Sequence, residues 1–171
     1  RASTITARFL NDLNHGVTHW IYFIGFEASS DVATDRDNAT KLMVYDRKSG
    51  TIFTNLKYDW FRQLRAAFPN GSRIYPLLAS PGGELTYTYG QKPYLNAAAA
   101  KRPDGGWSLG VVNLTGVGPD RRICQFHPAE KLAVTWDVPE LAAAGPVTFA
   151  VFRSDVARRF VPDGNLTMKE G

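Results

Sequence analysis

The residues best suited to chemistry gather around one apolar stretch of the sequence. Glu27 follows this stretch directly, and His19, Trp20 and Phe26 lie inside it. A carboxylate or an imidazole can transfer protons and form hydrogen bonds, and an aromatic ring offers a flat apolar face to a ligand. These four side chains are therefore our candidate binding residues.

The stretch itself is almost unbroken apolar sequence from Val17 to Phe26. A half-buried strand alternates apolar and polar residues, whereas a run of aromatic and β-branched residues beside Gly is typical of a strand buried on both faces. The sequence therefore predicts a buried strand over Val17–Glu27. Ligands of parallel α/β folds bind in the loops at the carboxyl end of such strands, which is where Glu27 lies.

Helices are predicted on both sides of this strand. Apolar residues at helical spacing predict one helix over residues 1–14 and another from Asn55 to Phe68, capped by Thr54. Lys41–Tyr45 and Thr51–Phe53 predict a small hairpin between the strand and the second helix. This order is typical of α/β architecture, but no further α/β unit follows, although a parallel sheet needs repetition.

After residue 72 the pattern changes to short strands separated by turns, so a domain boundary is expected near residue 71. The turn sequence Arg102-Pro103-Asp104-Gly105-Gly106 predicts a hairpin, and a helical turn is possible at Glu140–Ala144. The expected fold is thus a mixed α/β remnant followed by an antiparallel β-sandwich. The predicted strands are Arg73–Ala79, Glu84–Gly90, Tyr94–Lys101, Trp107–Leu114, Ile123–Phe126, Lys131–Trp136, Val147–Arg153 and Ala157–Pro162.

Composition and motifs exclude several classes of function. The chain of 171 residues has a net charge of +4, but its Lys and Arg are scattered, which argues against nucleic-acid binding. No membrane span or signal peptide is visible. The single cysteine, Cys124, cannot form an internal disulfide. The acidic loop with Asp31, Asp35 and Asp37 lacks the spacing of a calcium loop, so neither a metal nor another cofactor is expected.

The order of several short phrases carries a family resemblance. Asn14-His15-Gly16 precedes the apolar strand with Trp20, and a Leu-Met-Val-Tyr-Asp-Arg-Lys-Ser-Gly hairpin follows at residues 42–50. Three further phrases are Lys57-Tyr58-x-x-Phe61-Arg62-Gln63-Leu64, Gly71-Ser72-Arg73-Ile74 and Trp107-Ser108-Leu109-Gly110-Val111-Val112-Asn113-Leu114. Together they resemble the C-terminal part of clan-A glycoside hydrolases of the family-thirty type, which includes glucosylceramidases, xylanases and galactanases.

The resemblance implies that residues 1–71 are the last helix-strand-helix of a (β/α)8 barrel and that residues 72–171 are an accessory β-sandwich. Retaining hydrolysis uses two carboxyl groups about 5 Å apart, and in these families they follow the fourth and seventh strands. Val17–Glu27 would be the eighth strand, so the catalytic carboxylates would lie outside this chain. The implied partner is the missing N-terminal barrel polypeptide of the same enzyme, the implied substrate is a carbohydrate, and a secreted, lysosomal or periplasmic location is expected.

The resemblance leaves each candidate residue with two interpretations. Trp20 either stacks on a sugar or packs in the core. Phe26 is an alternative aromatic residue for stacking on the sugar, and it too could instead pack in the core. His19 either donates a hydrogen bond to the substrate or is a core residue. Glu27 is a polar lining residue or an ion-pair partner, and would be the nucleophile only if its strand were the seventh. The alternative function is a non-catalytic carbohydrate-binding or structural β-sandwich module.

Overall fold

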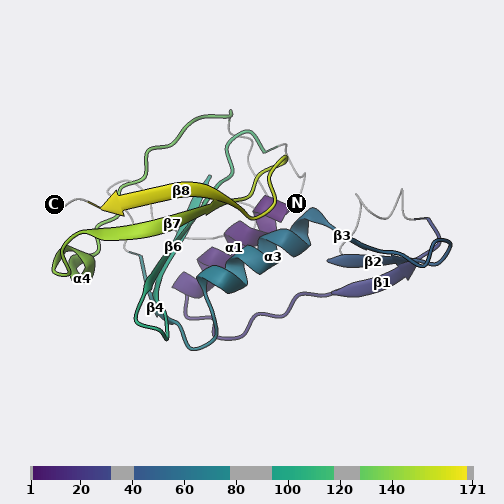
Figure 1. Ribbon diagram of the computed structural model, residues 1–171, viewed down its shortest axis with the longest axis horizontal. Helices are drawn as coiled ribbons and strands as arrows, with labels where there is room; N and C mark the ends of the chain where they lie inside the picture. Colours follow the sequence, from purple (N-terminus) through teal and green to yellow (C-terminus); the bar gives the residue numbers. More distant parts are fainter. Residues whose placement is uncertain (1, 32–40, 78–93, 118–127, 169–171) are drawn as a thin grey trace. The chain divides into compact units, whose positions relative to one another are not determined.

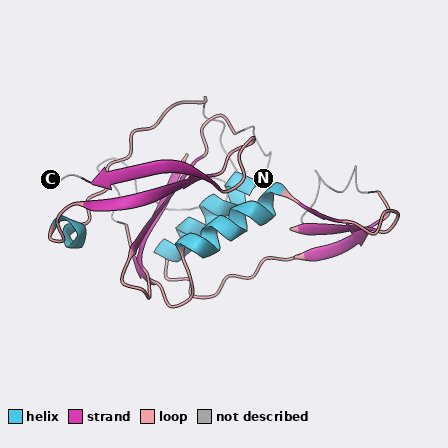
Figure 2. Cartoon of the chain, in the orientation of Figure 1, coloured by secondary structure: helices cyan, strands magenta, loops and turns pink. Residues whose placement is uncertain are grey.

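The computed structural model describes residues 2–31, 41–77, 94–117 and 128–168. Within these ranges the chain has mixed α/β structure, with three helices and eight strands in three small sheets and no barrel (Figure 1; Figure 2). The helices are α1 (Ala2–Asn14), α3 (Leu56–Ala67) and α4 (Pro139–Ala142). The strands are β1 (Phe26–Ser29), β2 (Met43–Asp46), β3 (Ile52–Thr54), β4 (Arg73–Tyr75), β5 (Leu95–Lys101), β6 (Trp107–Asn113), β7 (Val147–Arg153) and β8 (Val161–Met168).

Two compact units divide the chain, residues 1–130 and residues 131–171. Within the first unit, α1 and α3 pack against β5 and β6, so segments from both sides of residue 71 share one core. The domain boundary expected near residue 71 stays a prediction.

The core of the first unit lies between the two helices and the sheet β4–β5–β6. Small side chains on β5 let the helices approach closely: Ala98 and Ala100 are fully buried, and Leu10 of α1 is 1% exposed. Gly110 of β6 acts in the same way, because a Cβ built there would lie 3.0 Å from the ring of Phe68. Apolar surface buried in this way stabilises a fold by about 25 cal/mol per Å².

Both long helices confirm the predictions from apolar spacing. Helix α1 ends at Asn14, and α3 begins one residue after the N-cap Asn55, not after the predicted cap Thr54. The Asn55 side chain makes no cap hydrogen bond. Its Nδ2 donates instead to the carbonyl oxygen of Lys41 at 2.8 Å, which ties the beginning of α3 to the chain just before β2.

A second sheet in the first unit has the order β1–β2–β3, with β1 parallel to β2 and β2 antiparallel to β3. The β2–β3 pair confirms the predicted hairpin. In its turn, the carboxylate of Asp46 accepts hydrogen bonds from the Ser49 hydroxyl at 2.6 Å and the Lys48 amide at 2.9 Å. These bonds, that of Ser49 first, hold the pKa of Asp46 below its ordinary value.

The buried strand predicted over Val17–Glu27 is wrong. Residues 17–25 belong to no strand, and only Phe26–Ser29 pairs, with β2 as its neighbour. Ile21 is 92% exposed and Phe23 is 83% exposed. A strand buried on both faces needs neighbours at both edges and layers over both faces, and the described part of the chain supplies one neighbour for a strand of four residues.

The later strands follow the predictions in part. Strands β5, β6 and β7 confirm three of them, and residues 102–106 form the predicted turn between β5 and β6. No strand forms over Lys131–Trp136. Strand β8 begins at Val161 and not at Ala157, because the Asp155 carboxylate accepts hydrogen bonds from the amides of Ala157 and Arg158 and closes a turn there. Other expectations lie outside the described residues: strands Glu84–Gly90 and Ile123–Phe126, Cys124, Asp35 and Asp37.

The second unit contains α4 and the antiparallel β7–β8 hairpin, which has a register shift between Ala150 and Phe152. Oppositely charged side chains cross its end: Arg153 and Arg158 each lie within 4 Å of both Asp155 and Asp163. An isolated two-stranded hairpin is marginally stable in water. The register of the β7–β8 hairpin is therefore fixed locally, by the turn that Asp155 closes and by these ion pairs.

Candidate functional site

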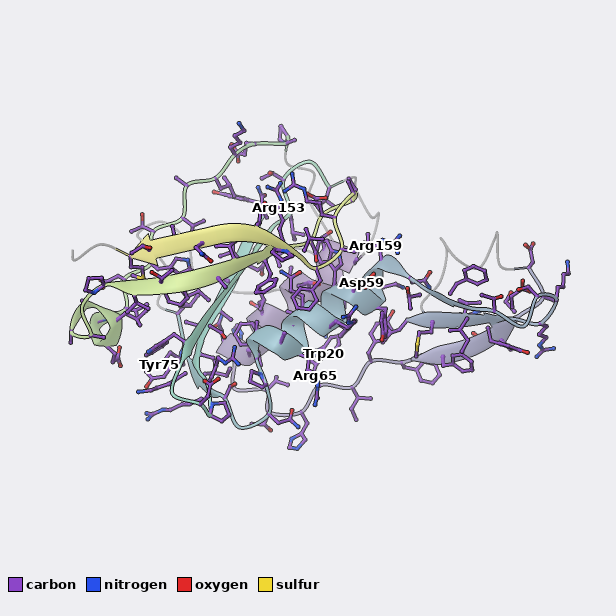
Figure 3. The ribbon with its side chains drawn as sticks, in the orientation of Figure 1. Trp20, Asp59, Arg65, Tyr75, Arg153 and Arg159 are labelled. Carbon is purple, nitrogen blue, oxygen red and sulfur yellow. The ribbon has the colours of Figure 1, made fainter. Side chains whose placement is uncertain are left out.

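Trp20 lies at the centre of an aromatic cluster that we define as Phe9, Trp20, Tyr22 and Phe61. Its ring centroid is 5.6 Å from Phe9 of α1, 5.5 Å from Phe61 of α3 and 6.2 Å from Tyr22, with which it stacks. Tyr22 and Phe61 are in turn 5.0 Å apart. Figure 3 shows Trp20 close to α3. The cluster therefore packs the side chains of Trp20 and Tyr22 against the two helices.

Polar contacts hold the same two side chains. The indole nitrogen of Trp20 donates a hydrogen bond to Oδ2 of Asp12 at 3.0 Å, and Arg8 lies 3.6 Å from the same oxygen. Nζ of the buried Lys57 donates to the hydroxyl of Tyr22 at 3.2 Å. Burial raises the pKa of the Tyr22 hydroxyl above its ordinary value.

The residues between and after them point the other way. Because side chains of an extended segment alternate between two faces, anchoring Trp20 and Tyr22 on the helices turns Ile21 and Phe23 toward solvent. The exposed fractions agree with this alternation, since Ile21 and Phe23 are the two most exposed large hydrophobic residues of the stretch. One face of residues 20–23 is thus covered by helices and the other is open.

Glu27 lies on β1 and forms an ion pair with Lys41. Its Oε2 is 2.8 Å from Nζ of Lys41, and the Glu27 side chain is 46% exposed whereas that of Lys41 is only 12% exposed. Phe26, the preceding residue, is 49% exposed and lies on the opposite face of the strand. Glu27 is therefore an accessible carboxylate held by a covered ammonium group.

The four candidate residues do not converge on one point. Trp20 belongs to the aromatic cluster, whereas Phe26 and Glu27 belong to the small sheet β1–β3. His19 is exposed, and its Nδ1 lies 3.0 Å from the hydroxyl of Thr18. Among the described residues, no group of three or more His, Cys, Asp or Glu side chains could hold a metal ion.

Several residues that contact the candidate residues were not identified from the sequence. Tyr22 carried a usable signal, because it lies two positions after Trp20 and shares its face of an extended segment. Lys41, Lys57 and Asp12 carried none, because their roles depend on contacts across 14, 35 and 8 positions of sequence.

Comparisons with known proteins give no match: no family model, no curated protein and no solved structure matches the chain. Within the described ranges, no helix is both long enough and apolar enough to cross a membrane.

Proposed function

We propose that this chain is the C-terminal segment of a retaining glycoside hydrolase that acts on the glycosidic bonds of an oligosaccharide, polysaccharide or glycoconjugate. In this proposal, residues 1–71 contribute to a (β/α)8 barrel and residues 72–171 to an accessory β-sandwich. The two catalytic carboxylates lie in the part of the enzyme outside these 171 residues. The order of the sequence phrases described above supports this assignment.

One structural observation carries the proposal: residues 20–23 are covered by helices on one face and open on the other. A strand of a (β/α)8 barrel has helices outside it and the side chains of other strands inside. Residues 20–23 form no strand in the described chain, but Trp20 and Tyr22 contact the helical layer, whereas Ile21 is 92% exposed and Phe23 is 83% exposed. The missing layer is what the rest of a barrel would supply.

The energetic cost of leaving this face open supports the same conclusion. Burying a large apolar side chain is worth about 1.5–3 kcal/mol. Contiguous exposed apolar surface marks sites where another polypeptide packs. We infer that Ile21 and Phe23 are covered, at least in part, by the N-terminal barrel polypeptide of the same enzyme, which is the partner this proposal requires.

Glu27 has no nucleophilic role in this proposal. Its ion pair with Lys41 supports the role of a polar residue that lines the site. A nucleophile on the seventh strand would need a further βα unit between β1 and α3, and the described chain forms the β2–β3 hairpin there.

The test compares the recombinant 171-residue chain with the protein isolated from its natural source by an antibody raised against the chain. Both samples are assayed for hydrolysis of 4-nitrophenyl glycosides of glucose, galactose and xylose, and the intact mass of each polypeptide is measured. We expect hydrolysis only in the natural sample, together with a polypeptide mass that exceeds that of the recombinant chain.

Two results would overturn the proposal. Hydrolysis by the recombinant chain alone would show that the catalytic carboxylates are within it. A natural sample that hydrolyses no glycoside, with a mass equal to that of the recombinant chain, would instead support the alternative of a non-catalytic carbohydrate-binding or structural module.

A further inference from the structure

Four side chains are neighbours at one end of the sheet β4–β5–β6, and we call them the outer cluster: Arg73, Tyr75, Lys101 and Trp107. Ala100, the residue before Lys101, is buried in the core against the helices, so Lys101 points to the opposite face of the sheet. The strand register places Lys101 directly opposite Arg73 of β4 and Trp107 of β6, and paired residues share a face. Tyr75 shares it too, because it lies two positions after Arg73 in β4.

The aromatic members of the outer cluster hold one of its cations. Cζ of Arg73 lies 5.3 Å from the centroid of the Tyr75 ring, and the ring centroids of Tyr75 and Trp107 are 4.8 Å apart. A guanidinium group is attracted to the face of an aromatic ring, and in a stacked position the N–H groups at its edge are still able to donate. Tyr75 is therefore a positioning residue for Arg73.

The two cations of the outer cluster lie together without an acid. Arg73 and Lys101 are both exposed, and Cβ atoms of directly opposite residues are about 4.5–5.5 Å apart. Within the described part of the chain, no carboxylate forms an ion pair with either. The nearby Asp104 pairs with Arg102 at 3.1 Å. Like charges directly opposite one another destabilise a sheet, so a bound anion would relieve a cost that the strand pairing imposes.

We propose that the outer cluster binds an acidic sugar. Arg73 and Lys101 donate to its carboxylate or sulfate group, and the partly exposed ring of Trp107 packs against the C–H face of the sugar ring. The fork of a guanidinium matches two oxygens of such an anion, and a lysine ammonium beside it adds a second charge. This inference rests on the proposed function for its premise that the ligand is a carbohydrate, and adds that this carbohydrate bears acidic groups.

The test is an NMR titration of the ¹⁵N-labelled 171-residue chain with five probes. Digalacturonic acid carries carboxylates, galactose 6-sulfate carries a sulfate, and galactobiose is their neutral counterpart. Inorganic sulfate tests for a bare anion, and hexauridylate tests for a nucleic acid. We expect at least one acidic sugar to shift the amide signals of residues 73–75, 99–101 and 107–109, and galactobiose to leave them unchanged.

Substitutions separate the roles within the outer cluster. Arg73→Gln and Lys101→Gln should each weaken binding of the acidic sugar by about tenfold, equivalent to about 1.4 kcal/mol. Trp107→Leu should weaken binding of the sugar but not of inorganic sulfate, because only the sugar has a C–H face. Tyr75→Leu should weaken binding less, and its effect should vanish in the Arg73→Gln background, because Tyr75 acts through Arg73.

Two control variants match these substitutions elsewhere in the first unit. Arg62→Gln removes another arginine that lies over a tyrosine ring, 5.9 Å from the centroid of Tyr58, but one that pairs with Asp59 at 3.5 Å. Lys48→Gln removes an exposed lysine from the β2–β3 turn. Both should leave the dissociation constant unchanged, and dispersed amide signals show that each variant is folded.

Four results would overturn the inference. The site is wrong if neither acidic sugar shifts these signals, or if binding survives in the Arg73→Gln/Lys101→Gln double variant. The choice of a sugar is wrong if inorganic sulfate binds as tightly as both acidic sugars, or if hexauridylate binds more tightly than either.

The two proposals fail in distinguishable ways. If an acidic sugar binds at the outer cluster but the natural protein hydrolyses no glycoside, the binding site stands and the hydrolase proposal fails. If the natural protein hydrolyses glycosides but no acidic sugar binds at the outer cluster, the hydrolase proposal stands and this site is wrong.

Discussion

The helix–sheet core of the first unit and the stretch Val17–Phe26 are both apolar in sequence, yet their exposure is opposite. Leu10, Ala98 and Ala100 are each at most 1% exposed to solvent, whereas Ile21 and Phe23 are almost fully exposed. The core is made of elements that cover one another, whereas in the described part of the chain only one face of residues 20–23 is covered by helices. An apolar sequence therefore indicates that burial would be favourable, and the neighbouring elements decide whether the segment is buried.

The largest expected effect contrasts one residue from each region. Leu10→Ala should lower the free energy of unfolding by about 2–5 kcal/mol, because it leaves a cavity between α1 and the sheet. Ile21→Ala should change the stability of the isolated chain by no more than about 0.5 kcal/mol. Urea denaturation of both variants checks this, and similar losses would show that the stretch is buried in solution.

A second contrast uses two glycines. Gly110→Ala should cost about 1–3 kcal/mol, because the added methyl group overlaps the packed core at 3.0 Å from the Phe68 ring. Gly25→Ala is the matched control, since no heavy atom lies within 4 Å of a Cβ at that position. Thermal unfolding followed by circular dichroism measures both, and an unchanged melting temperature for Gly110→Ala would show that α3 and β6 are less tightly packed than described.

A third prediction concerns the anchor that joins the two regions. Trp20→Phe keeps an aromatic ring in the cluster but removes the hydrogen bond to Asp12, which should cost about 1 kcal/mol. In a double-mutant cycle with Asp12→Ala, which removes the acceptor, the coupling energy should be about 0.5–1.5 kcal/mol. Additive losses would mean that the Trp20–Asp12 hydrogen bond does not form in solution.

The smallest effect extends the comparison to an exposed charged group. Backbone hydrogen bonds from Ala157 and then Arg158 hold the pKa of Asp155 below its ordinary value. A carboxylate with a lowered native pKa stabilises the fold above its ordinary pKa, and this contribution is lost as the pH falls through the native value. Acidification should therefore lower the protection factors of the amides in the β7–β8 turn, which compare the exchange rate with the intrinsic rate at each pH, and Asp155→Asn should abolish that pH dependence. If the protection of the turn amides depends on pH in the same way in Asp155→Asn as in the unsubstituted chain, Asp155 does not stabilise the turn through its lowered pKa.

How far the sequence predicted the fold depends on the range of the contacts involved. Helix α1, helix α3 and the β2–β3 hairpin follow from local spacing and turn residues, and they are confirmed. The predicted strand at Val17–Glu27 is wrong because a strand requires a hydrogen-bonded neighbour, which no local pattern can supply. The N-cap at Asn55 was missed for a similar reason, since its side chain binds the carbonyl of Lys41.

The candidate site shows the same limit. The sequence identified the stretch that carries Trp20, Phe26 and Glu27, because aromatic and acidic residues stand out within an apolar run. It could not separate the anchored Trp20 from the outward Phe23, since that depends on which face α1 and α3 cover. It also could not assign Lys41 to Glu27, because the parallel pairing of β1 and β2 brings them together.

The sequence by itself determined the helices, the hairpin turns and the apolar stretch, because each depends on residues within a few positions of one another. Only the tertiary structure decided which side of that stretch is covered, since the covering helices come from before and after it in the chain. Burial is a property of neighbours in space, and this is why one apolar segment became a core while another became an exposed face.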